Sequence, residues 1–79
     1  MKIKITKLEE LPDALHPNNI SVGYETIREV YEDYFKEPCV DYRFNVGSFS
    51  TSRVTEIIDE HTFKTLSSIY KWEIVEDEL

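Results

Sequence analysis

Hydrophobic and polar residues alternate along much of the chain, which is the pattern of a strand with one buried face. Near the N-terminus, Ile3 and Ile5 alternate with polar residues, so we predict a strand over residues 2–8. The same period of two in the second half predicts strands over 40–46, 51–58, 62–66 and 68–75. The run from Val54 to Ile58 alternates imperfectly, which a β-bulge or burial on both faces would explain.

A different period governs residues 23–36. At 100° per residue, its apolar side chains fall within an arc of about 140°, as in an amphipathic helix. Pro38 would end such a helix. The apolar stripe contains Tyr24, Ile27, Val30, Tyr31, Tyr34 and Phe35, and the opposite face carries Glu25, Glu29, Glu32, Asp33 and Lys36. We therefore predict a helix over residues 23–36.

These elements predict one α+β domain over residues 1–79. Short connections between the later strands favour an antiparallel β-meander. The single amphipathic helix would cover the open face or one end of that sheet. A second arrangement remains open, in which the strands curl into a small SH3-like barrel and the helix lies in the first long loop.

Charge restricts the classes of partner. The chain has sixteen acidic and nine basic residues, for a net charge of −7. That balance makes direct binding of nucleic acid unlikely, because neutralisation of phosphates supplies much of the affinity there. It also disfavours binding to anionic membranes. A protein partner is expected instead, and a cationic one would suit the charge.

The predicted location is the cytoplasm. The N-terminus lacks the continuous apolar stretch of a signal peptide or a membrane-spanning helix. Cys39 is the only cysteine, so no internal disulfide can form. We expect a core or half-buried thiol, because the predicted helix would end just before it and its dipole would disfavour a reactive thiolate.

The sequence contains no coherent catalytic or metal-binding set, so we predict a protein that is not an enzyme and needs no cofactor or metal. His16 has no nearby histidine or cysteine with ligand spacing. Asp59, Glu60 and His61 are adjacent, and a solvated hairpin loop explains them better than an acid–base cluster. Basic residues next to Tyr42, Tyr70 and Trp72 are better explained by contacts within a sheet than by stacking on nucleic acid.

One loop contains candidate anion ligands. Ser50, Ser52 and Arg53 follow Gly47 in a hydroxyl-rich segment, although the glycines and lysine of a phosphate loop are missing. Hydroxyls that cap their own backbone are the competing interpretation.

The segments FSTSRVTEI, TFKT and SIYKW, which begin at Phe49, Thr62 and Ser68, form a pattern that resembles short uncharacterised bacterial and phage proteins. The resemblance covers the C-terminal part of the chain only. It implies a compact β-rich domain and a prokaryotic or phage setting, and it implies no activity or site.

The leading hypothesis is a regulatory or accessory protein-interaction module. Its contact surface would be a sheet edge or the helix face with Glu25, Glu29, Glu32 and Asp33. Two alternatives are a nucleic-acid mimic or inhibitor from a mobile element, with these carboxylates in place of phosphates, and a small-ligand or anion site in the 48–53 loop. A homodimer that pairs through an open sheet edge is compatible with all three.

Overall fold

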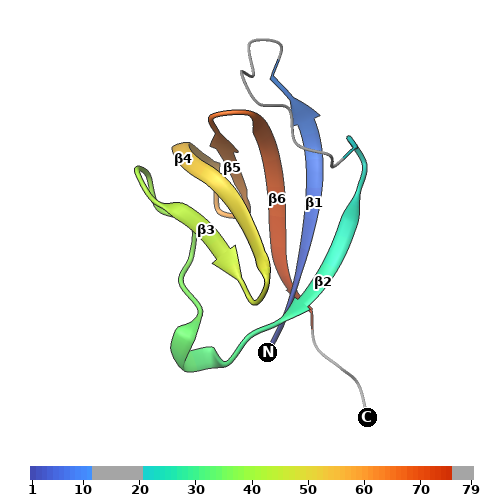
Figure 1. Ribbon diagram of the computed structural model, residues 1–79, viewed down its shortest axis with the longest axis vertical. Helices are drawn as coiled ribbons and strands as arrows, with labels where there is room; N and C mark the ends of the chain where they lie inside the picture. The colour runs from blue at the N-terminus through green and yellow to red at the C-terminus, as the bar shows by residue number, and fades with distance from the viewer. Residues whose placement is uncertain (12–20, 76–79) are drawn as a thin grey trace.

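The computed structural model describes residues 1–11 and 21–75, and in it the chain is an all-β domain. Six antiparallel strands form one sheet that curls into a half-barrel (Figure 1). The strands are β1 (Lys2–Glu10), β2 (Glu25–Glu29), β3 (Arg43–Val46), β4 (Phe49–Asp59), β5 (Thr62–Thr65) and β6 (Ser68–Val75). Their order across the sheet is β2-β1-β6-β5-β4-β3, so that β3 to β6 follow one another as a meander.

The strands lie close to the ranges in which polar and apolar residues alternate. β6 spans residues 68–75, the range that alternation predicts, and β1 runs two residues beyond 2–8. β4 is longer than 51–58 at both ends, and β3 begins at Arg43 rather than at residue 40. The uneven run from Val54 onward coincides with two shifts in the register of β4 against β5, as a bulge requires.

The predicted helix over 23–36 is wrong, and with it the α+β class. Residues 25–29 form strand β2, and a single 3-10 turn, η1 (Glu32–Tyr34), follows it. Most of the proposed apolar stripe is exposed: Ile27 is 57% exposed and Tyr31 is 79% exposed. Val30 and Phe35 alone among the stripe residues pack against the core.

Long-range pairing outweighs the helical period in this segment. An isolated helix of about 14 residues is marginal in water, so tertiary contacts decide the conformation of this segment. β2 completes the hydrogen bonding of β1, with Ile5 opposite Thr26 and Ile3 opposite Arg28. Without β2, one edge of β1 would have unpaired backbone groups. The β-branched Thr26 and Ile27 suit the strand that results.

The sheet does not close into an SH3-like barrel. Within the described part of the chain, β2 and β3 are the two edges and do not pair with each other. The edges come close at one end only, where the turn between β3 and β4 reaches the end of β2 (Figure 1). There Arg28 Nη1 donates a hydrogen bond of 2.8 Å to Ser48 Oγ. A Cβ atom on Gly47 would lie 3.1 Å from the carbonyl oxygen of Glu29.

A chain of aromatic rings fills the concave face of the half-barrel. Phe63 lies at its centre, with its ring centroid 5.0 Å from that of Phe44 and 5.6 Å from that of Tyr70. Trp72 continues the chain, with its ring centroid 6.2 Å from that of Phe44. The buried hydrophobic residues are Ile3, Ile5, Phe44, Val46, Phe49, Val54, Phe63, Tyr70 and Trp72. One aromatic core therefore supports every strand except the edge strand β2.

Candidate functional site

The four carboxylates predicted as an interaction surface are all exposed, but they do not share a helix face. Glu25 and Glu29 alternate with the half-buried residues of β2 and so lie on its outward face. Glu32 and Asp33 occupy the first turn of η1. Glu25 also forms a 3.4 Å ion pair with Lys4 of β1, and since both side chains are reached by solvent, this pair contributes little to stability. The carboxylates thus follow the edge of the sheet and the turn beyond it.

Two tyrosines next to these carboxylates are largely exposed to solvent. Tyr31 is 79% exposed and Tyr34 is 77% exposed, with their rings edge to face and 6.3 Å apart. Neither hydroxyl forms a hydrogen bond with any residue that the structure describes. We call the set Glu25, Glu29, Tyr31, Glu32, Asp33 and Tyr34 the acidic tyrosine surface.

Half-buried residues on both sides of η1 hold these tyrosines in place. Val30 and Phe35 pack against the core, and the Phe35 ring centroid is 5.4 Å from that of Trp72. Between them, the backbone N–H of Tyr34 donates to the carbonyl of Tyr31 at 2.9 Å, which closes the turn. The tyrosine rings are therefore presented from a turn that is anchored at both ends.

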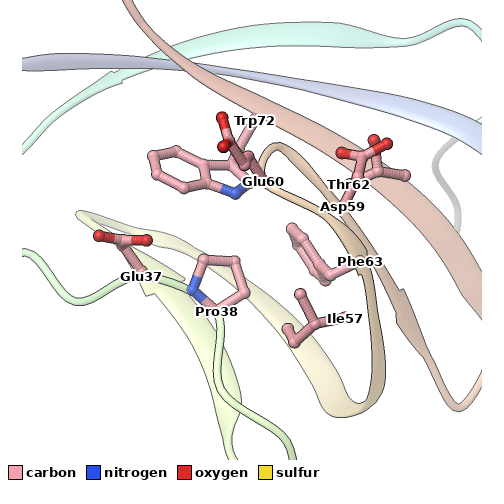
Figure 2. Close-up of a pocket in the computed structure, with 8 residues that line it drawn as sticks. All are labelled: Glu37, Pro38, Ile57, Asp59, Glu60, Thr62, Phe63 and Trp72. Carbon is pink, nitrogen blue, oxygen red and sulfur yellow. The ribbon is translucent and has the colours of Figure 1, made fainter.

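The segment between η1 and β3 forms one side of a small pocket. Glu37 and Pro38 face the end of the β4–β5 hairpin across a space of about 90 Å³, which has room for about three water molecules. Its apolar lining comes from Pro38, Ile57, Phe63 and Trp72, and its polar lining comes from Glu37, Asp59, Glu60 and Thr62. In Figure 2 the carboxylates of Glu37 and Asp59 lie on opposite sides of the apolar residues. An apolar pocket with three acidic residues around it suits a small cationic group.

Asp59, Glu60 and His61 form a hairpin end. Asp59 Oδ1 accepts the backbone N–H of His61 at 2.9 Å, and His61 Nδ1 lies 3.1 Å from the carbonyl oxygen of Trp72. The pKa of Asp59 lies below its ordinary value of 3.8, first because of the His61 N–H and second because the Thr62 hydroxyl donates to it. The carboxylate is engaged in shaping the turn rather than in pairing with the His61 ring.

The candidate anion residues separate into two groups. Ser52 and Arg53 line an open hollow of about 400 Å³ on the outward side of β3 and β4, together with Asp41, Arg43 and Leu66. Ser50 does not line this hollow, and its hydroxyl points to the neighbouring Thr51 carbonyl at 3.5 Å. The hollow includes a second arginine, Arg43, directly opposite Arg53 in the β3–β4 pairing.

The remaining candidates do not assemble into a site. His16 lies outside the described residues. Cys39 is exposed, so the expectation of a core or half-buried thiol is wrong, and the short 3-10 turn η1 takes the place of the helix that was predicted before it. Tyr70 and Trp72 are buried on the concave face, so they are unavailable for stacking on nucleic acid.

Sequence reasoning missed Tyr31 and Tyr34 as surface residues and Arg43 as a partner of Arg53. The helical period assigned both tyrosines to a buried stripe, and no local signal contradicts that assignment. Arg43 could have been found in part. A hairpin that turns at Gly47 and Ser48 places Arg43 opposite Ser52, one residue from Arg53, and a bulge supplies the remaining step.

The fold and these surfaces define a small all-β half-barrel domain with an exposed acidic and aromatic edge. No family, curated protein or solved structure matches the chain. The resemblance to short bacterial and phage proteins therefore stays a prediction. Among the residues described, no helix is long and apolar enough to cross a bilayer. The same residues contain no group of three or more histidine, cysteine, aspartate or glutamate side chains arranged for a metal ion.

Proposed function

We propose that this protein is a non-enzymatic binding module that takes up a basic segment of another protein on the acidic tyrosine surface. The observation that carries the proposal is the pair of exposed rings of Tyr31 and Tyr34, fixed in an anchored turn beside Glu32 and Asp33. Exposed aromatic groups of this kind are concentrated at protein–protein contacts, where tyrosine is a frequent energetic centre.

Charge selects the kind of partner. Arginine and lysine can stack on a tyrosine face while they pair with a neighbouring carboxylate, and each such contact with a ring is worth about 0.5–2 kcal/mol. The acidic pocket beside Trp72 would accept one further cationic side chain from the same segment. A second copy of this chain is a poor occupant, because two acidic surfaces would meet face to face within a chain of net charge −7.

The carboxylates give less support to a nucleic-acid mimic. It needed carboxylates spaced along a helix, and Glu25 to Asp33 instead run along a strand and a turn. The sheet edge at β2 remains part of the proposed surface, since Glu25 and Glu29 lie on it.

A titration with defined peptides tests the proposal. The probes are a series of fixed peptides that carry zero to four arginines or lysines, followed by amide chemical shifts of the ¹⁵N-labelled protein. Binding should strengthen with each basic residue, weaken as salt rises, and shift the amides of residues 31–34. The double variant Tyr31→Ala, Tyr34→Ala should bind about 10- to 30-fold more weakly, as expected when a hot spot is truncated.

Tyr42→Ala is the matched control, because Tyr42 is 68% exposed and lies outside the surface. It should leave peptide affinity unchanged. Reversal of Glu29, Glu32 and Asp33 to lysine should abolish the preference for basic peptides. Equal affinity in the double tyrosine variant and the parent, or concentration-dependent self-association through residues 31–34, would overturn the proposal.

A further inference from the structure

Two arginines face each other across β3 and β4, and among the described residues no carboxylate lies within ion-pair distance of either. Arg43 and Arg53 are direct cross-strand neighbours, and both are exposed. Side chains in such positions have Cβ atoms about 4.5–5.5 Å apart, and like charges there destabilise the pairing. Within the described part of the chain, neither guanidinium forms an ion pair with a carboxylate within 4.0 Å. The fold therefore concentrates two positive charges on one spot of an acidic molecule.

A β-bulge produces this arrangement. Between the pairs Arg43–Arg53 and Asn45–Ser50, β4 advances by one residue more than β3 does. Thr51 stabilises the bulge from inside the molecule, since its Oγ1 accepts the Phe44 N–H at 3.1 Å and donates to the Ser52 carbonyl at 2.7 Å. Without the extra residue, Arg43 would face Ser52. The position of Arg43 opposite Arg53 therefore depends on a bulge that the buried Thr51 side chain stabilises.

The hollow around the pair is open to solvent and large enough for a small molecule. Its volume of about 400 Å³ is within the range of small-molecule sites. Ser52 adds a hydroxyl, which lies 3.4 Å from the Ser67 hydroxyl. Leu66 provides an apolar wall and is 54% exposed. Asp41 places one carboxylate at the same hollow and limits the charge that the hollow can accept.

We propose that Arg43 and Arg53 bind the phosphate group of a phosphomonoester, with its organic part against Leu66. Guanidinium groups present paired N–H donors that match phosphate oxygens, and the bonds are charge-assisted. A dianionic phosphate would neutralise the two arginines and remove their mutual repulsion. Because Asp41 repels further negative charge, a single phosphate fits the hollow better than a polyphosphate or a nucleic-acid backbone.

The test is a titration of the whole protein with phenyl phosphate, inorganic phosphate and a phosphoserine peptide, monitored by amide and arginine Nε–H chemical shifts. Phenyl phosphate should saturate and shift Arg43, Ser52, Arg53 and Leu66. Inorganic phosphate should shift the arginines and bind more weakly. The peptide distinguishes a phosphorylated protein from a small metabolite as the source of the group, according to which binds more tightly.

Arg43→Gln and Arg53→Gln should each weaken phenyl phosphate binding at least 10-fold. Lys71→Gln is the control, since it removes the same charge from an exposed position on β6 and should leave the affinity unchanged. Both arginine variants should fold, because each removes a repulsion, and their melting temperatures should equal or exceed that of the parent. Phenyl phosphate should raise the melting temperature of the parent but not of the variants.

Three results would overturn the proposal: shifts that never saturate, equal losses in Lys71→Gln and the arginine variants, or melting temperatures that fall in both arginine variants. The last would show that the pair serves the fold. The site is separate from the acidic tyrosine surface, so basic-peptide binding should be the same in Arg53→Gln and the parent.

Discussion

Single residues decide how tightly the open half-barrel is drawn together. Gly47 has a positive φ of 57° in the turn between β3 and β4, a conformation that glycine adopts freely. The same residue lies where this turn meets the end of β2, next to the carbonyl of Glu29. The hydrogen bond from Arg28 to the Ser48 hydroxyl stabilises this contact. The turn therefore has both a conformational and a steric reason to lack a side chain.

Gly47→Ala should lower the free energy of unfolding by about 1–2 kcal/mol, the usual penalty for a left-handed L-residue, with a further loss from the 3.1 Å contact. Urea denaturation measures it. Gly47→Asn separates the two causes, because asparagine tolerates this φ but still carries a Cβ atom. A Gly47→Ala variant as stable as the parent would contradict the close approach of the turn to β2.

Asp59 gives stability a defined dependence on acid pH. Its pKa is lowered in the folded protein, so its contribution is complete above the ordinary value of 3.8 and is lost as pH falls below that value. Thr62→Val removes the hydroxyl donor and should raise the pKa of Asp59 towards 3.8. An NMR titration of the Asp59 carboxyl carbon in both proteins measures the change. An identical pKa in the two proteins would show that the hydroxyl does not act on it.

At the scale of elements, alternation located the strands because burial on one face leaves a period of two in the sequence. Residues 68–75 illustrate this, with Tyr70 and Trp72 buried and Lys71 exposed between them. The prediction of a helix over residues 23–36 was wrong for a physical reason. Their hydrophobic period matched a helix, but their conformation depends on pairing with β1. Because the edge strand β2 exposes Ile27, apolar and polar residues do not alternate in its sequence.

The candidate sites were also predictable only in part. The exposure of Glu25, Glu29, Glu32 and Asp33 follows from their charge and needed no knowledge of the fold. The prominence of Tyr31 and Tyr34 did need it, because a tyrosine in an amphipathic pattern is usually buried. The arginine pair depends on the Thr51 bulge, which strand periodicity does not encode.

Ile27→Thr distinguishes a strand from a helix at this segment. On the outward face of β2, Ile27 is 57% exposed, so the substitution should change the free energy of unfolding by no more than about 0.5 kcal/mol. On the buried stripe of a helix, it would cost well over 1 kcal/mol. Chemical denaturation of the variant and the parent measures the difference. A large loss of stability would contradict the strand and support a helix at this segment.

At the scale of the whole molecule, stability rests on a single aromatic core. A chain of 79 residues has a total stability of about 4–12 kcal/mol. Its core is continuous from Phe49 through Tyr70, Phe63 and Phe44 to Trp72, with neighbouring ring centroids 5.0–6.2 Å apart. No second core exists among the described residues to hold part of the sheet if this one fails.

Phe63→Ala should therefore cost about 3–5 kcal/mol and bring the protein close to global unfolding at 37 °C. Near-UV circular dichroism and thermal melts measure it. Phe63→Leu keeps most of the volume and should retain the fold with a smaller loss. Independent melting of β1 and β2 in Phe63→Ala would contradict a single cooperative unit.

The pairing of β1 with β6 sets the time at which the fold can form. Lys2 lies opposite Val75, so the β1–β6 pair joins the two ends of the described chain. During synthesis, the β3–β6 meander can assemble from neighbouring segments, but β1 has no inner neighbour until β6 has left the ribosome. The β1–β2 hairpin waits with Ile3 and Ile5 uncovered until that moment. Closure of such a distant contact makes folding slow relative to a helical chain of equal length.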